Sequence, residues 1–87
     1  MINITDLKKK ITYRSNYRGT KEMDKLLGNF TKKYINILKE NELIELSELL
    51  DCDDENLYKL YQGQATTIKF HLNKVTELFK NYVYENK

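Results

Sequence analysis

Residues 14–24 read Arg-Ser-Asn-Tyr-Arg-Gly-Thr-Lys-Glu-Met-Asp and join one helical pattern to the next. This short run contains opposite charges and a glycine, with Arg18, Gly19 and Glu22 at its centre. Gly19 permits a turn, and Thr20 can cap the helix that follows. The stretch therefore predicts a junction between two helices, and most of the remaining chain is expected to be the scaffold that carries it.

A short amphipathic helix precedes the junction. Ile4, Leu7 and Ile11 fall on one stripe, and either Thr5 or Asp6 can cap the N-terminus. The lysines at 8–10 should lie on the solvated side. The helix is expected to fade at residues 15–16, where a serine and an asparagine compete for backbone hydrogen bonds.

The longest apolar stripe follows the junction. Its members recur at helical spacing and are Met23, Leu26, Leu27, Phe30, Tyr34 and Ile37. Gly28 interrupts this helix at a propensity cost of up to roughly 1 kcal/mol relative to alanine. Close approach of another helix is the expected reason for a glycine at this position.

Three further helices are predicted. The third buries the stripe Leu43, Ile44, Leu46, Leu49 and Leu50, and exposes Glu42, Glu45 and Glu48. The fourth is capped by Asp53, carries two further acids in its first turn, where they complement the macrodipole, and stops at Gly63. The fifth opens at Thr66 or Thr67 and carries the stripe Ile68, Leu72, Val75, Phe79 and Tyr82.

The composition agrees with a single all-helical domain over residues 1–87. The chain has no proline, three glycines and 40% apolar residues. Five short helices with brief connections imply a compact all-α antiparallel bundle. With a single cysteine, the sequence cannot form an internal disulfide. It shows neither a long apolar run nor a leader pattern, so export and membrane insertion are not expected. A bacterial cytoplasm is the expected location, with the free protein a monomer.

Charge is distributed unevenly along the chain. Residues 1–39 carry a net charge of +7, residues 40–62 carry −7, and the last segment carries +2. Such a dipolar surface favours association with a complementary protein. Nucleic acid would meet an acidic flank, so binding to it is not expected.

The sequence contains little catalytic chemistry. His71 is the single histidine, with no cysteine or acid at metal-ligand spacing, and Cys52 lacks a CxxC partner. The acids at 51–55 lack the spacing, central glycine and closing glutamate of a calcium loop. No catalytic residue, metal site or tightly bound cofactor is predicted.

The junction allows a structural and a functional interpretation. Arg18 and Glu22 are four residues apart and can pair across the corner, which would make the stretch a cap and an ion pair. Alternatively, Gly19 allows a partner backbone to approach closely. Arg18, Tyr17 and Arg14 would then supply the planar and charged contacts common at interface hot spots.

The region Tyr13-Arg-Ser-Asn-Tyr-Arg-Gly-Thr-Lys-Glu-Met-Asp-Lys-Leu-Leu-Gly-Asn-Phe30 resembles the RGxxE region of the SdhE family of succinate dehydrogenase assembly factors, the flavinators. The later run Leu46-Ser-Glu-Leu-Leu-Asp-Cys-Asp-Asp-Glu-Asn-Leu-Tyr58, with Gly63 following, resembles the second block of this family. The resemblance covers roughly residues 7–63. At the position of Tyr17, relatives in this family usually carry histidine or another basic or aromatic residue.

The resemblance implies a five-helix assembly chaperone that is not an enzyme. Such a protein binds the flavoprotein subunit of succinate dehydrogenase or fumarate reductase and promotes covalent attachment of FAD to a histidine of that subunit. The chain would act on FAD held by its partner. The family motif corresponds to Arg18, Gly19 and Glu22, with Arg14, Tyr17 and Asp24 as neighbouring partner-binding candidates.

Two other functions are compatible with parts of the sequence. One is a regulatory or antitoxin-like interaction module, a label also attached to this family. The other is a nucleic-acid binder that uses the basic first 39 residues, although no recognition helix is evident. Salt-sensitive binding to an oligonucleotide would indicate the second function.

Overall fold

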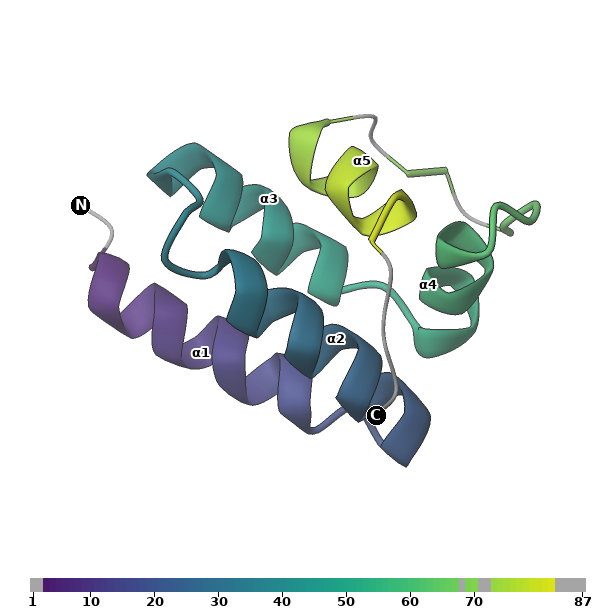
Figure 1. The fold of residues 1–87 in the computed structure, drawn as a ribbon, viewed down its shortest axis with the longest axis horizontal. Helices are drawn as coiled ribbons and strands as arrows, with labels where there is room; N and C mark the ends of the chain where they lie inside the picture. Colours follow the sequence, from purple (N-terminus) through teal and green to yellow (C-terminus); the bar gives the residue numbers. More distant parts are fainter. Residues whose placement is uncertain (1–2, 68, 71–72, 83–87) are drawn as a thin grey trace.

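The computed structural model describes residues 3–67, 69–70 and 73–82 of the chain. In these residues it contains five helices and no strand (Figure 1). They are α1 (Ile4–Asn16), α2 (Lys21–Tyr34), α3 (Glu40–Leu50), α4 (Asp54–Tyr61) and α5 (Lys74–Lys80). The radius of gyration is 12.2 Å, close to the roughly 12 Å expected for a compact chain of this length. The all-α prediction is confirmed.

Helix α1 packs against α2 and α3, while α5 packs against α3 and α4 (Figure 1). The predicted stripes supply most of the core, which consists of Ile11, Met23, Leu26, Leu27, Phe30, Leu38, Leu43, Leu46, Leu49, Leu50, Leu57, Val75 and Phe79. Phe30 of α2 makes edge contact with Phe79 of α5 at 5.3 Å between ring centroids. Helices α2 and α5, which are distant in the sequence, therefore meet in one apolar core.

The seam between α1 and α2 is tight. A Cβ atom built on Gly28 would lie 2.5 Å from Oδ1 of Asn16, so the predicted close approach of a second helix at this glycine is confirmed. Next to it, the buried hydroxyls of Ser15 and Thr31 lie 2.6 Å apart, and the Ser15 hydroxyl also donates to the carbonyl of Ile11 at 2.7 Å. Small side chains thus let the two helices approach closely without unpaired polar groups at this pair.

Several predicted caps are present. The hydroxyl of Thr20 accepts from the backbone N–H of Met23 at 3.2 Å, and the carboxylate of Asp53 accepts from that of Asn56 at 3.2 Å. Gly63 has a φ of +72° just after α4, as expected for a glycine stop. The predicted cap of α1 is wrong, because Asn3 accepts from the N–H of Asp6 at 3.1 Å and the helix begins before either candidate.

The predicted burial is corrected at two positions, Ile37 and Glu42. Ile37 is 69% exposed, because α2 ends at Tyr34 and the chain turns before reaching it, and Leu38 is buried instead. Glu42 was expected on the exposed side of α3 but is only 7% exposed. Its carboxylate accepts from the backbone N–H of Lys39 at 2.8 Å and lies 3.1 Å from Nζ of Lys74 on α5.

The fifth helix begins later than predicted. Asn73 caps it by accepting from the N–H of Thr76 at 2.8 Å, and α5 runs only from Lys74 to Lys80. Thr67 does not open a helix, because its N–H donates to Oδ1 of Asn56 at 2.8 Å and holds the segment against α4. Ile68, His71 and Leu72 lie outside the described residues. Val75 and Phe79 are buried as expected.

Candidate functional site

The corner between α1 and α2, residues 17–20, carries the predicted site. Gly19 has a φ of +116°, a conformation that L side chains rarely adopt, and no atom lies within 4 Å of where its Cβ would be. The backbone at Gly19 is therefore held in a glycine-specific turn and faces open space. The predicted turn is confirmed.

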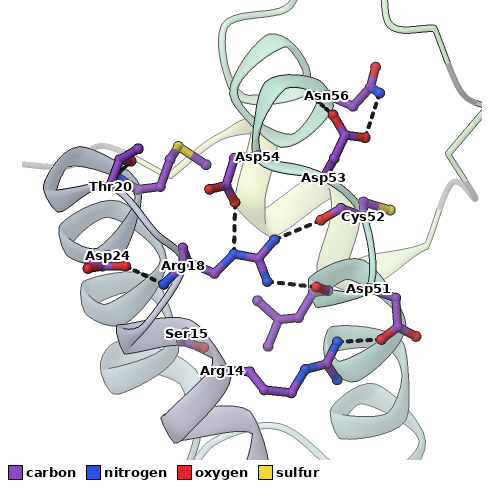
Figure 2. A network of polar contacts seen from close by, with 12 residues as sticks. Arg14, Ser15, Arg18, Thr20, Asp24, Asp51, Cys52, Asp53, Asp54 and Asn56 are labelled. Carbon is purple, nitrogen blue, oxygen red and sulfur yellow. Dashed lines mark hydrogen bonds and ion pairs between the residues drawn. The ribbon is translucent and has the colours of Figure 1, made fainter.

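The side chain of Arg18 points into the molecule from this corner (Figure 2). Its Nε donates to Oδ1 of Asp54 at 2.9 Å, and its two terminal nitrogens donate to the carbonyls of Leu50 and Cys52, each at 2.7 Å. The side chain is only 11% exposed. One planar guanidinium thus ties the corner to the end of α3 and the start of α4.

The predicted ion pair between Arg18 and Glu22 is wrong. The guanidinium pairs with Asp54 on α4, which also lies in the first turn of that helix, where a carboxylate is favoured. The exposed Glu22 instead interacts with Tyr58 of α4. The negative charge of Glu22 has the larger effect and its hydrogen bond to Tyr58 the next largest, and both raise the pKa of the Tyr58 phenol above the ordinary value of 10.0.

The remaining predicted residues surround the corner. The carboxylate of Asp24 accepts from the backbone N–H of Arg18 and closes the turn. Arg14 pairs with Asp51 (Figure 2) and also donates to the carbonyl of Ser47 at 3.4 Å.

Tyr17 is 70% exposed and stacks on Tyr13, with 4.7 Å between ring centroids. The structure therefore gathers all six predicted residues around one corner but turns them in different directions. Tyr17, Gly19 and Glu22 are exposed, whereas Arg18 is engaged inside.

Asp54, Tyr58 and Tyr13 were not predicted as part of this site. The sequence feature that could have pointed to Asp54 is the opposite net charge of residues 1–39 and 40–62. Part of this complementarity is satisfied within the chain, since Arg14 and Arg18 pair with Asp51 and Asp54.

Cys52 is half-buried beside the network. Burial raises the pKa of its thiol, and the charges of Asp53 and Asp51 raise it further. Its thiol is therefore less reactive than that of an ordinary exposed cysteine.

Neither a metal centre nor a membrane span is found among the described residues. Within this part of the chain, no group of three or more His, Cys, Asp or Glu side chains could hold a metal ion. Over the same residues, no helix has the length and apolar character needed to cross a bilayer.

Fold and site together define a small all-helical protein with a charged, glycine-containing corner. A family model described as "Flavinator of succinate dehydrogenase" matches residues 9–83, which include this corner. The chain therefore belongs to the flavinator family of succinate dehydrogenase assembly factors.

Curated relatives agree with this membership. The chain is 33% identical over 82 residues to "Succinate dehydrogenase assembly factor 2, mitochondrial" of Debaryomyces hansenii, covering 90% of this chain and 57% of the relative. The protein of the same name from Scheffersomyces stipitis is 45% identical over 49 residues, covering 56% of this chain and 33% of the relative. The chain thus matches about a third to three-fifths of the length of these relatives.

No solved structure matches the chain. The relatives carry the word mitochondrial in their names, and the expected bacterial cytoplasm stays a prediction.

Proposed function

We propose that this protein binds the flavoprotein subunit of succinate dehydrogenase or fumarate reductase and promotes covalent attachment of FAD to that subunit. The observation that carries the proposal is the open space around Gly19 in a chain of the flavinator family. A backbone without a side chain lets a partner backbone approach closely. The bond-forming chemistry would belong to the flavin and to the partner, so the chain would act as an assembly chaperone rather than an enzyme.

The corner residues would have different roles in this function. Tyr17, Gly19 and Glu22 are exposed and could touch the partner directly, with Arg14 and Asp24 beside them. Arg18 makes three side-chain contacts inside the chain, so its contribution would be to hold the corner in shape. A preformed corner would lose little conformational entropy on binding.

Gly19→Arg tests the proposal, with Gly63→Arg as a matched control. Both glycines have positive φ and open space around them, so both variants carry a backbone cost and the same added charge, the cost being larger at Gly19, whose φ of +116° lies farther from the αL region than the +72° of Gly63. We expect Gly19→Arg to lose co-purification with the flavoprotein subunit and to lower its covalent flavin fluorescence on a denaturing gel. Gly63→Arg should retain both.

Three results would contradict the proposal. Loss of helical circular dichroism in Gly19→Arg alone would show that the glycine serves the fold. Unchanged covalent flavin in cells that lack this protein would count against the function itself. Capture of a toxin or cytoskeletal protein in place of a flavoprotein would favour a regulatory interaction module.

A further inference from the structure

Two tyrosines, one near the end of α1 and one directly after it, have side chains that are mostly exposed to solvent. Tyr13 is 65% exposed and Tyr17 is 70% exposed, and their rings stack on each other. Tyr13 lies on α1 and Tyr17 directly follows it, while the opposite side of this helix is buried through Ile11 and Ser15. Exposed aromatic side chains of this kind are enriched at interface hot spots, where one face is apolar and the hydroxyl can bond to a partner.

The tyrosines line a shallow pocket on the outer side of α1. Its other lining residues are Lys9, Thr12 and Asn16, which lie on the same face at helical spacing. Asn16 is also the residue that touches Gly28 across the α1–α2 seam. The pocket therefore runs along α1 beside the seam and reaches the corner at Tyr17.

Lys9 lines this pocket, and further lysines lie on the two helices of the adjoining seam. Lys9 and Lys10 lie one turn before Tyr13, and Lys25 and Lys32 lie one turn on either side of Gly28 on α2. Over residues 3–67, 69–70 and 73–82, no ion pair within 4.0 Å involves any of these four lysines. We call Lys9, Lys10, Lys25, Lys32 and the two tyrosines the Lys–Tyr face.

Two nearby carboxylates are engaged elsewhere. Asp24 accepts from the backbone of Arg18, and Asp51 pairs with Arg14. Within α1 itself the sequence supplies one acid, Asp6, at the N-terminal end, one turn before the first lysines of the face. The Lys–Tyr face thus combines unneutralised positive charge with exposed aromatic surface.

We infer that the Lys–Tyr face binds an acidic segment of the flavoprotein subunit, an inference that rests on the function proposed above. Carboxylates of that segment would pair with the lysines, and its apolar atoms would cover the tyrosine rings. Continuity supports this occupant, since Tyr17 directly precedes Arg18 and Gly19 in the corner. A partner that binds at Gly19 would also contact the adjoining Lys–Tyr face.

Single-stranded nucleic acid also uses stacked aromatics beside positive charge. An oligonucleotide on this face would leave the adjoining open backbone at Gly19 without a partner, whereas a protein bound at Gly19 continues onto the face. Protein is therefore the assigned partner class, and an oligonucleotide serves as the competing ligand in the test.

The test measures affinity of the full chain for the purified flavoprotein subunit by titration calorimetry. A double variant, Tyr13→Ala with Tyr17→Ala, should weaken binding at least about tenfold, as expected for truncated hot-spot residues. Lys9→Glu should weaken it about fivefold and reduce its salt dependence. Ile37→Ala and Lys69→Glu are controls, because both residues are exposed but lie outside the Lys–Tyr face, and both should stay within about twofold.

The outcomes separate this inference from the proposed function. If the wild-type chain binds the flavoprotein subunit and the affinity of the tyrosine double variant differs from it by less than about twofold, the inference is overturned. The proposed function is then left standing. Absence of wild-type binding would overturn both. Tighter binding of a single-stranded oligonucleotide than of the flavoprotein, lost in the double variant, would also overturn the inference. An unchanged urea midpoint in the double variant confirms that the fold is intact.

Discussion

The two ends of α3 are both held by charged side chains, but in different ways. At the C-terminal end, Arg18 donates to the carbonyl of Leu50 and Arg14 pairs with Asp51. At the N-terminal end, the carboxylate of Glu42 accepts from the backbone of Lys39 and lies near Lys74. Cations at the C-terminus and an anion at the N-terminus both complement the helix macrodipole.

The two groups are similarly buried and differ in the number of their contacts and in titration. The guanidinium of Arg18 is 11% exposed and makes three hydrogen bonds inside the chain. Glu42 is a carboxylate whose pKa is lowered from 4.5, chiefly by its hydrogen bond from Lys39 and then by Lys74. The C-terminal end should therefore contribute more stability, and the N-terminal end should respond to acid.

The largest effect is expected for Arg18→Gln. This change leaves the Asp54 carboxylate and two carbonyls without their cationic donor, so the free energy of unfolding should fall by about 2–4 kcal/mol. Urea denaturation measures this loss. Arg14→Gln is the control, because its side chain is 34% exposed and its ion pair should be worth no more than about 1 kcal/mol. If both variants lose the same free energy of unfolding, the two arginines do not differ in their contribution to stability.

A smaller, pH-dependent effect is expected for Glu42→Gln. A lowered folded-state pKa means that the unfolded chain binds more protons, so the stabilisation from Glu42 is present above its ordinary value of 4.5. It is lost as the pH falls through the folded-state pKa. Thermal unfolding between about pH 3 and pH 7 should show a shallower acid slope in the variant.

Some acid slope should remain in the Glu42→Gln variant. The pKa of Asp53 is likewise lowered, from 3.8, by hydrogen bonds from Asn56. Identical slopes in wild type and variant would contradict the role given to Glu42 at the N-terminal end of α3.

The smallest effect on stability is expected for Glu22→Gln, which touches neither end of α3. Its free energy of unfolding should stay within about 0.5 kcal/mol of wild type, because the side chain is exposed. The pKa of Tyr58 should fall back toward 10.0, since Glu22 is the largest cause of its upward shift. Ultraviolet titration of phenolate formation measures this, with Tyr58→Phe identifying the signal. If the pKa of Tyr58 is the same in the variant and the wild type, Glu22 is not the cause of its upward shift.

The sequence predicted features that depend on neighbours in the chain. The turn at Gly19, the caps at Thr20 and Asp53, and the stop at Gly63 follow from local backbone chemistry. The close helix approach at Gly28 was also predicted, because a glycine inside a strong helical pattern costs stability unless a neighbouring helix needs the space.

The missed features join residues that are distant in sequence. Arg18 and Asp54 are 36 positions apart, and nothing local distinguishes Asp54 from the acids beside it. Glu42 and Lys74 likewise pair between two separate helices. The late start of α5 was missed because Asn56 binds Thr67 and competes with helix formation there. Tertiary contacts of this kind override local propensity.

The low reactivity of the Cys52 thiol has a practical consequence. A half-buried thiol with a raised pKa should react sluggishly with maleimide dyes at neutral pH, and the sequence has no other cysteine. A new cysteine placed on an exposed helix position would then be labelled selectively. Fluorophores attached in this way could follow docking and release in real time without a cysteine-free background.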